Sequence, residues 1–255
     1  MTKIKNNSII KYLIHGTPFR PVHIGQYLRE KYFFRHLKAL PVTQFHKVLD
    51  AGCGPGIYAR KLAVAYPHME VTGLDAKEFA SWSKLPKNVQ FKQQDLTQLS
   101  EENYYDFSYC IDVLEHIPGN RLVLEKIFTS LKPGGYFYLH MPDDKHNQRI
   151  FPKKFFKEFE KWAEDEHIGE QYTLEEIKNI FKSTGFAIIK THSTFGFWGK
   201  LAWEFDRITD GEMLLKILLM PLLKLWAHFD LWLLKSSGAI CVIGQKPVPN
   251  EMTLE

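Results

Sequence analysis

The sequence predicts an α/β fold built on a nucleotide-binding sheet, and three observations near residue 50 support it. An apolar run ends in Asp50, glycines then follow at every second position (Gly52, Gly54 and Gly56), and a helical pattern begins at Ile57. Together they indicate a strand, a tight turn and the start of a helix. Glycine suits this turn because its backbone can bend sharply and approach a ligand closely.

The glycine spacing and the acid before it indicate the kind of ligand. A dinucleotide fingerprint is G-x-G-x-x-G, whereas this turn is G-x-G-x-G with Asp50 two residues before the first glycine. A carboxylate there would repel a pyrophosphate and would suit a ligand with a cationic ammonium end. The string D-A-G-C-G-P-G over residues 50–56 resembles motif I of the class I S-adenosylmethionine (SAM) dependent methyltransferases.

The N-terminal part of the chain is expected to be helical. Residues 9–14 form a candidate short helix, and residues 23–40 have a helical pattern that Pro41 ends. The aromatic cluster Tyr32-Phe33-Phe34 in the second helix has two interpretations: it packs on the sheet, or it lines an apolar substrate cleft.

The rest of the chain alternates between strands and helices. Compact apolar runs bounded by Gly, Pro or polar residues predict strands, and helical periodicity with caps predicts helices. One helix has a capping box at Thr173-Leu174-Glu175-Glu176 and ends at Gly185, and Lys132-Pro133-Gly134-Gly135 ends another. The expected strands are 47–51, 69–74, 89–92, 104–111, 136–141, 186–191 and 239–244, and the expected helices are 57–65, 77–84, 119–131, 155–163 and 173–185.

Further motifs strengthen the resemblance. Asp75 ends the second strand about 20–25 residues after the glycine turn, where an acid suits ribose hydroxyls; a loop carboxylate or helix N-cap is the alternative. D-V-L-E-H-I over residues 112–117 resembles the post-strand motif of a small-molecule (methyltransferase type 11-like) subgroup, and L-K-P-G-G before the fifth strand also matches. The resemblance implies that Asp95 and Leu96 contact the adenine. The cofactor residues implied in all are Asp50, Gly52, Cys53, Gly54, Asp75, Ala76, Asp95, Leu96, Ile111, Asp112 and His116.

The resemblance also implies the architecture. It covers residues 47–141 well, and 170–191 and 239–246 more loosely. It implies a three-layer, Rossmann-like, seven-stranded mixed sheet in the order 3-2-1-4-5-7-6 with strand 7 antiparallel. We therefore expect an N-terminal helical cap segment (1–46), a SAM-binding domain (47–197 and 236–248) and a helical insertion (198–235).

The insertion between strands 6 and 7 is unusually long. It is expected to hold a helix over 198–208, a capping box at Thr209-Asp210-Gly211-Glu212, and a helix over 213–234. In that last helix Lys216, Lys224, His228, Asp230 and Lys235 fall within an arc of about 160°, and the remaining face is apolar. Three roles fit this pattern: a lid over a greasy substrate, peripheral membrane contact through 213–234 with the lysines toward headgroups and Trp226 and Trp232 near the boundary, or a structural insert packed on the sheet.

The chemistry itself calls for few protein groups. Methyl transfer from a sulfonium needs an aligned nucleophile and, for some acceptors, a base. His116 is the first candidate base, because it follows the fourth strand and titrates near neutrality; capping or packing of the next helix is the alternative. His140 and His167 are weaker candidates. No spacing of acids and histidines indicates a metal site, so none is expected.

Composition narrows the function. The net charge of +4 is too mild to favour nucleic acid. Three widely spaced cysteines and the lack of an N-terminal signal pattern favour a cytoplasmic protein with reduced thiols. We expect a methyltransferase that acts on a small, apolar acceptor, such as a lipid, a polyprenyl or quinone-like compound or an aromatic metabolite, and releases S-adenosylhomocysteine. The alternatives are a protein or RNA methyltransferase, which the lack of an N/D-P-P-Y motif disfavours, and a catalytically silent binding subunit.

Overall fold

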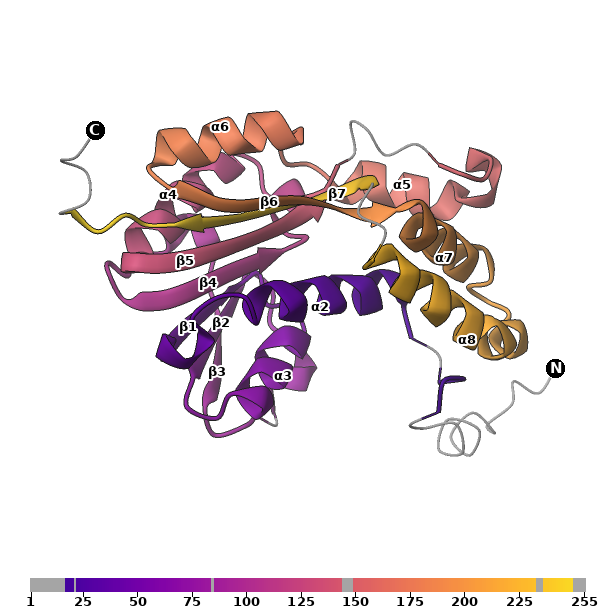
Figure 1. Cartoon of the computed structure of the whole chain (residues 1–255), viewed down its shortest axis with the longest axis horizontal. Coiled ribbons are helices and arrows are strands. Elements are labelled where there is room, and N and C mark those ends of the chain that lie inside the picture. Colours follow the sequence, from indigo (N-terminus) through magenta and orange to yellow (C-terminus); the bar gives the residue numbers. More distant parts are fainter. Residues whose placement is uncertain (1–16, 21, 84, 144–148, 233–235, 250–255) are drawn as a thin grey trace.

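Seven strands form one mixed sheet in the order β3-β2-β1-β4-β5-β7-β6 (Figure 1). The computed structural model describes residues 17–20, 22–83, 85–143, 149–232 and 236–249. Strand β7 runs antiparallel to both β5 and β6, and the other pairs are parallel. The implied topology is therefore confirmed. The strands are β1 (Lys47–Ala51), β2 (Glu70–Asp75), β3 (Val89–Gln93), β4 (Tyr105–Ile111), β5 (Leu131–Pro142), β6 (Ala187–Gly196) and β7 (Ser236–Gln245).

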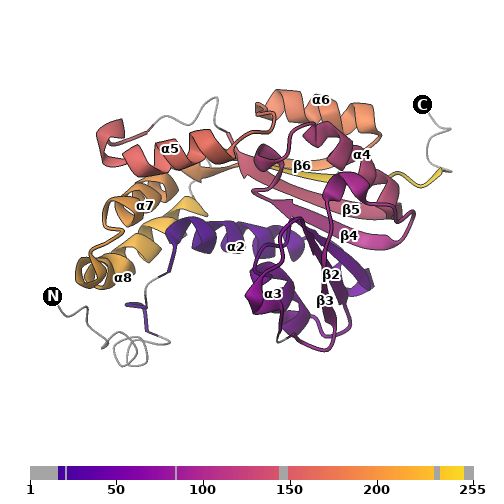
Figure 2. The same ribbon diagram turned by 180° about the vertical axis from the view of Figure 1, so that it is seen from behind.

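Helices cover both faces of this sheet, which gives three layers (Figures 1 and 2). Helices α2 (Ile24–Leu37) and α3 (Ile57–Ala65) pack on one face, and α4 (Asn120–Ser130) and α6 (Leu174–Thr184) on the other. Helices α5 (Lys157–Glu166), α7 (Phe197–Ile208) and α8 (Met213–Asp230) gather at one end of the molecule. The expected helix over 9–14 lies outside the described residues.

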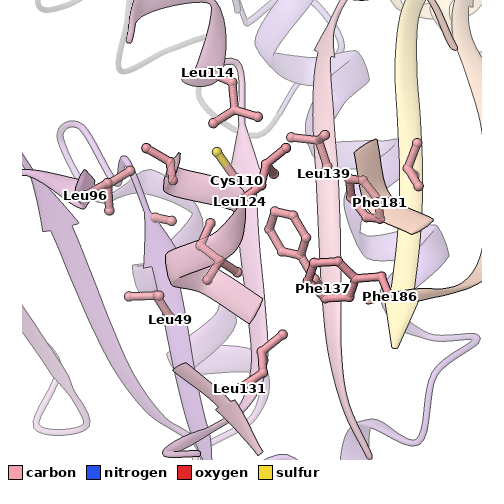
Figure 3. Packing of buried hydrophobic residues seen from close by; sticks show 14 of the residues in the cluster. Leu49, Leu96, Cys110, Leu114, Leu124, Leu131, Phe137, Leu139, Phe181 and Phe186 are labelled. Carbon is pink, nitrogen blue, oxygen red and sulfur yellow. The ribbon is translucent and has the colours of Figure 1, made fainter. Parts of the chain in front are cut away.

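Apolar side chains lock the layers together. On one face, Leu124 of α4 and Phe181 of α6 pack against Cys110 and Phe137 of the central strands (Figure 3). On the other face, Phe33 of α2 is fully buried, with its ring centroid 4.8 Å from that of Tyr109. Of the two interpretations of the Tyr32–Phe34 cluster, packing on the sheet is therefore the one that the structure supports.

Two local predictions have different outcomes. The capping box of α6 is confirmed, because the Glu176 amide donates to Thr173 Oγ1 and the Thr173 amide donates to the Glu176 carboxylate. The capping box predicted at residues 209–212 is wrong. The hydroxyl of Thr209 donates to the Phe205 carbonyl at the end of α7, and α8 begins after Glu212 without a side-chain cap. A Thr at the end of one helix can bond back to the preceding turn, and that bond competes with capping of the next.

The expected helix over 77–84 is instead a 3₁₀ turn, Ala80–Ser83. Its position is fixed by contacts with the glycine turn, since Trp82 Nε1 donates to the Gly54 carbonyl at 2.9 Å and Ser81 Oγ donates to the Pro55 carbonyl at 3.0 Å. Tertiary hydrogen bonds here override the helical pattern of the segment.

Helices α7 and α8 form a pair that packs on α2 and on the ends of β6 and β7. Ile24 and Leu28 of α2 share a buried cluster with Met220 and Leu223 of α8, and Phe195 and Ala239 join the same cluster. The predicted outward polar face of α8 is wrong for Lys216 and Asp230, whose residues are only 7% and 2% exposed. Lys216 Nζ pairs with Asp206 at 2.8 Å and Asp210 at 3.0 Å, so it cannot face lipid headgroups. Lys235 lies outside the described residues.

Among the helices that the structure describes, none has the length and hydropathy needed to cross a membrane.

Candidate functional site

The glycine turn after β1 has the backbone shape that only glycine adopts freely. Gly52, Gly54 and Gly56 have φ angles of +80°, +50° and +79°. A Cβ on Gly52 would lie 2.3 Å from a methyl of Val113, whereas a Cβ on Gly54 would meet nothing within 4 Å. Gly52 is therefore required by packing, and Gly54 faces open space that a ligand can approach.

The predicted acids lie at the carboxyl ends of the parallel strands, a side of the sheet that we call the sheet edge. Asp75 ends β2, where its Oδ2 accepts from the Gly54 amide at 2.8 Å and its Oδ1 from the Lys77 amide at 2.9 Å. Asp95 follows β3, and its Oδ1 accepts from the Thr97 amide at 2.8 Å. Both carboxylates thus brace turns, which was the alternative considered for Asp75. Each carboxylate oxygen has a second lone pair, so ribose or adenine contacts remain open to both.

Asp50 has the most unusual environment of the predicted cofactor residues. It is 3% exposed, and burial raises its pKa from 3.8 to about 7. Its Oδ2 has no hydrogen-bond partner within the described part of the chain. A buried carboxylate oxygen in this state is stabilised by a nearby cation, so the site fits the cationic end of SAM.

The remaining predicted cofactor residues surround the same turn. Cys53 and Leu96 are buried, whereas Ala76 is exposed directly after β2. Ile111 is the last residue of β4. The Gly52 and Cys53 amides both donate to the carbonyl of Leu74 in β2, so these two amides already have an acceptor within the protein.

A cavity of about 990 Å³ opens beside this edge, between the segment that follows β4, the ends of β5, β6 and β7, and helices α5 and α7. Of the predicted cofactor residues only Asp112 and His116 line it. The Asp50, Asp75 and Asp95 carboxylates lie outside it, so the cavity is a neighbour of the glycine turn and not part of it. Aromatic side chains form one part of its wall, namely Phe151, Phe159, Trp162, Phe195 and Trp203, and charged side chains such as Arg29, Arg149, Lys200 and Arg207 form another. A cavity of this size and lining suits a small organic molecule.

His116 lines this cavity with one ring nitrogen fixed. Its Nδ1 lies 2.9 Å from the Glu166 carbonyl oxygen. A carbonyl only accepts, so Nδ1 must carry the proton, and in the neutral ring Nε2 is then the unprotonated nitrogen. His116 can therefore accept a proton at Nε2 without losing its anchor.

His140 lies in the same wall but is held at both nitrogens. Its Nδ1 lies 2.6 Å from Asp112 Oδ1 and its Nε2 lies 3.0 Å from Thr194 Oγ1. The ring is 1% exposed. Because protonation at Nε2 would break the bond donated by the threonine, His140 is better placed to position Asp112 than to take a proton.

Asp112 is held in a strained conformation by this network. Its φ is +51°, and its Oδ2 forms an ion pair with Arg29 of α2 at 2.5 Å. Burial would raise the pKa of Asp112, but Arg29 and His140 outweigh burial and hold it below the usual range. Strain of this kind persists only where the surroundings enforce it, which is frequent at functional sites.

Several residues of the cavity wall could not be predicted from the sequence. Arg149 pairs with Glu160 of α5 at 2.8 Å and lies 4.8 Å from the Trp203 ring centroid. Arg207 of α7 lies 5.0 Å from the centroid of Phe159. These residues are far apart in the chain and follow no motif. The aromatic richness of residues 155–163 was the one available signal.

His167 lies next to His116, with ring centroids 5.0 Å apart. The buried Glu115 lies beside them. Each of these three residues offers one atom that could bind a metal ion, and the three atoms lie within 4.8 Å of one another. Clusters of this kind also occur without an ion, so the expected absence of a metal stays a prediction.

The chain was compared with known proteins. A family profile described as a methyltransferase domain matches residues 24–191. Trans-aconitate 2-methyltransferase of Methylobacterium nodulans is 32% identical over 110 residues, covering 42% of this chain and 43% of the relative. Ubiquinone biosynthesis O-methyltransferase of Acinetobacter baylyi is 30% identical over 137 residues, covering 50% and 56%. The matches thus span about half of these curated relatives.

Solved structures show the same fold. Phosphoethanolamine N-methyltransferase 2 of Haemonchus contortus, solved in complex with SAM, superposes with a TM-score of 0.60 at 22% identity, over 85% of this chain and 52% of that one. The sarcosine dimethylglycine methyltransferase structure from Galdieria sulphuraria gives 0.59 at 19% identity, over 86% and 85%.

Proposed function

The chain belongs to the methyltransferase-domain family that matches residues 24–191, and from this premise we propose that it methylates a small, largely apolar acceptor. The cofactor of the family is SAM, and a solved neighbour holds it. The observation that carries the proposal is the aromatic cavity of about 990 Å³ beside the glycine turn. The aromatic side chains of this wall favour an acceptor with a substantial apolar body.

The proposed cofactor contacts follow the three acids at the sheet edge. Asp50 would meet the ammonium of the amino-acid end, Asp75 the ribose and Asp95 the adenine. The open space over Gly54 supports this placement. When bound there, SAM supplies an activated methyl group to a nucleophile on the acceptor.

In the proposed mechanism His116 is the general base. His116 lines the cavity and its Nδ1 donates to the Glu166 carbonyl, so its Nε2 is the nitrogen that would take a proton from an acceptor hydroxyl or amine. The Arg29–Asp112–His140 network would hold the adjoining wall rigid, so that acceptor and methyl donor stay aligned.

The relatives support a small-molecule acceptor, since their names include trans-aconitate, ubiquinone-biosynthesis and sterol methyltransferases. A protein or RNA substrate fits less well, because a polymer needs an open groove and the net charge of the chain is only +4. A silent binding subunit is the remaining alternative.

The test uses the full chain and labelled SAM. Isothermal titration with SAM should show binding, and incubation with lipid and metabolite extracts should place the label in an extractable small molecule. If SAM does not bind, the alternative of a catalytically silent binding subunit would be favoured. Label found only in added protein or RNA would overturn the small-molecule acceptor.

A further inference from the structure

Helix α8 exposes an apolar stripe along its whole length. Seven large side chains between 40% and 72% exposed form it, namely Leu214, Leu215, Leu218, Leu222, Leu225, Phe229 and Trp232. Successive members from Leu218 onward are three or four residues apart, which places them on one helix face. An 18-residue helix is about 27 Å long. The stripe therefore runs the length of the helix and continues to Trp232 in the turn after it; Figure 1 shows where α8 lies in the molecule.

The acidic side chains of α7 and α8 point inward instead. Glu204, Asp206 and Asp230 are each at most 2% exposed. Glu204 accepts from the Ile150 and Phe151 amides, and Asp206 accepts from the Ile24 amide at the start of α2. Within these two helices, all three acids are thus used to hold the pair in place, and the outer face carries none.

Basic side chains lie beside the part of the stripe from Leu218 onward. Lys224 Nζ donates to the Pro18 and Arg20 carbonyls at 2.9 Å each, which holds the exposed Phe19 and Arg20 against α8. At the other end, the exposed Arg35 donates to the Leu231 carbonyl. The sequence that leads into this region is also basic: residues 1–20 contain three lysines, one arginine and no acid. Asp210 and Glu212 are acidic, but they lie in the loop before α8.

An apolar stripe beside the basic residues Arg20, Lys224 and Arg35, called the basic rim, best matches one kind of partner. An anionic bilayer offers an apolar interior below a negatively charged headgroup layer, and amphipathic helices lie in that interface. A second copy of the chain would bring the same basic rim against itself, which charge repulsion disfavours. The absence of a membrane-crossing helix among the described residues is compatible with contact at the surface only.

We propose that α8 docks on an anionic lipid surface through this stripe, with Phe19 and Arg20 beside it. Helix α7 packs beneath α8 and contributes Lys200, Trp203 and Arg207 to the cavity wall. Docking would therefore hold the cavity close to the bilayer. The docking needs no methyl transfer, so a failure of the proposed function would not contradict it, and the reverse also holds.

The test is co-sedimentation of the full chain with vesicles of phosphatidylcholine alone or mixed equally with phosphatidylglycerol. The double variant Leu218→Glu/Leu225→Glu places two carboxylates on the stripe. Val64→Glu is the matched control, because Val64 is 72% exposed on α3, away from the stripe. The wild type and the control should sediment with the mixed vesicles and should be released at high salt. The double variant should have an apparent affinity for the mixed vesicles at least about tenfold lower. Titration with SAM should give equal affinity in all three, which confirms folding.

Three outcomes would overturn the proposal. The first is a wild type that stays in the supernatant with both kinds of vesicle. The second is a double variant that sediments as well as the wild type; if removal of residues 1–16 then abolishes binding, the N-terminal segment is the membrane element. The third is a wild type that does not bind vesicles but is dimeric by light scattering and becomes monomeric in the double variant, which would make the stripe an interface between copies.

Discussion

Two histidines that end up in one cavity wall differ in the freedom of their ring nitrogens. Within the described residues, the ring of His116 is hydrogen-bonded through Nδ1 to the Glu166 carbonyl, which leaves Nε2 as its proton-accepting nitrogen. His140 has an acceptor or donor partner at both nitrogens. The distinction follows from hydrogen-bond geometry, which the residue type alone does not reveal.

His116→Ala is expected to lower turnover about 10²–10⁴-fold while SAM affinity stays nearly unchanged. The reason is that the variant removes the base but none of the acids near the glycine turn. Steady-state kinetics and SAM titration measure the two effects, with His68→Ala, an exposed position, as the control. Normal turnover in His116→Ala would remove this residue from the mechanism and would fit a carbon or sulfur acceptor.

Asp50 should make stability depend on pH. Its pKa in the folded chain is about 7 against an ordinary 3.8, so the folded state holds a proton that the unfolded state has released. Stability should therefore fall as pH rises from about 4 to about 7 and level off above that. Buried His36 has the opposite effect: its pKa is lowered to about 3 by burial, so it makes stability rise with pH up to about 6.5.

The contribution of Asp50 is isolated by comparison with Asp50→Asn, in which His36 is unchanged. The variant should gain stability relative to wild type across pH 4 to 7, measured by urea unfolding without SAM at about five pH values. Parallel stability curves for the two proteins would show that Asp50 is ionised in the apo fold.

At the scale of elements, one carboxylate joins α2, α7 and α8. Asp230 at the end of α8 accepts from the Tyr32 hydroxyl at 2.7 Å, the Gly196 amide at 3.1 Å and the Gly199 amide at 2.9 Å. A Cβ on Gly199 would lie 2.5 Å from Asp230 Oδ2, so this approach also depends on glycine. The pair of helices is thereby fixed to the N-terminal helix.

Asp230→Ala is expected to reduce the free energy of unfolding by about 2–4 kcal/mol, because three buried donors lose a charged acceptor. Urea unfolding measures the loss, and Asp165→Ala, an exposed acid on α5, provides the control. Limited proteolysis should also find the α7–α8 loop near Gly211 more readily cut in Asp230→Ala. Equal stability of both variants would mean that apolar packing alone holds these helices.

At the scale of the whole molecule, the proposed cofactor site is assembled from the end of β1 and the turns after β1, β2 and β3, so cofactor binding should stabilise the entire fold. SAM at roughly 100 times its Kd should raise the free energy of unfolding by about 2.7 kcal/mol. Asp75→Ala should weaken SAM binding by roughly 1–3 kcal/mol, with the exposed Glu78→Ala as control. An unchanged Kd in Asp75→Ala would disprove the ribose assignment.

Local sequence signals were enough to predict the sheet and the turn at its centre. Glycine spacing, apolar runs and caps are local signals, and they are satisfied by contacts near them in the chain. Gly52, for example, is required by its own backbone angle and by Val113. The position of the acids at one sheet edge followed from the parallel topology, because parallel strands end on the same side.

The tertiary structure alone decided the acceptor side and the orientation of α8. A helical wheel divides a helix into faces but does not say which face meets a neighbour. Lys216 looked like an outward charge, yet Asp206 and Asp210 offer it partners inside, and the leucines were left outside. The cavity likewise joins Arg29, His116, Arg149 and Trp203, which only the packing of α2, α5 and α7 brings together. Long-range pairings of this kind leave no periodic signal in the sequence, because they depend on how whole elements dock.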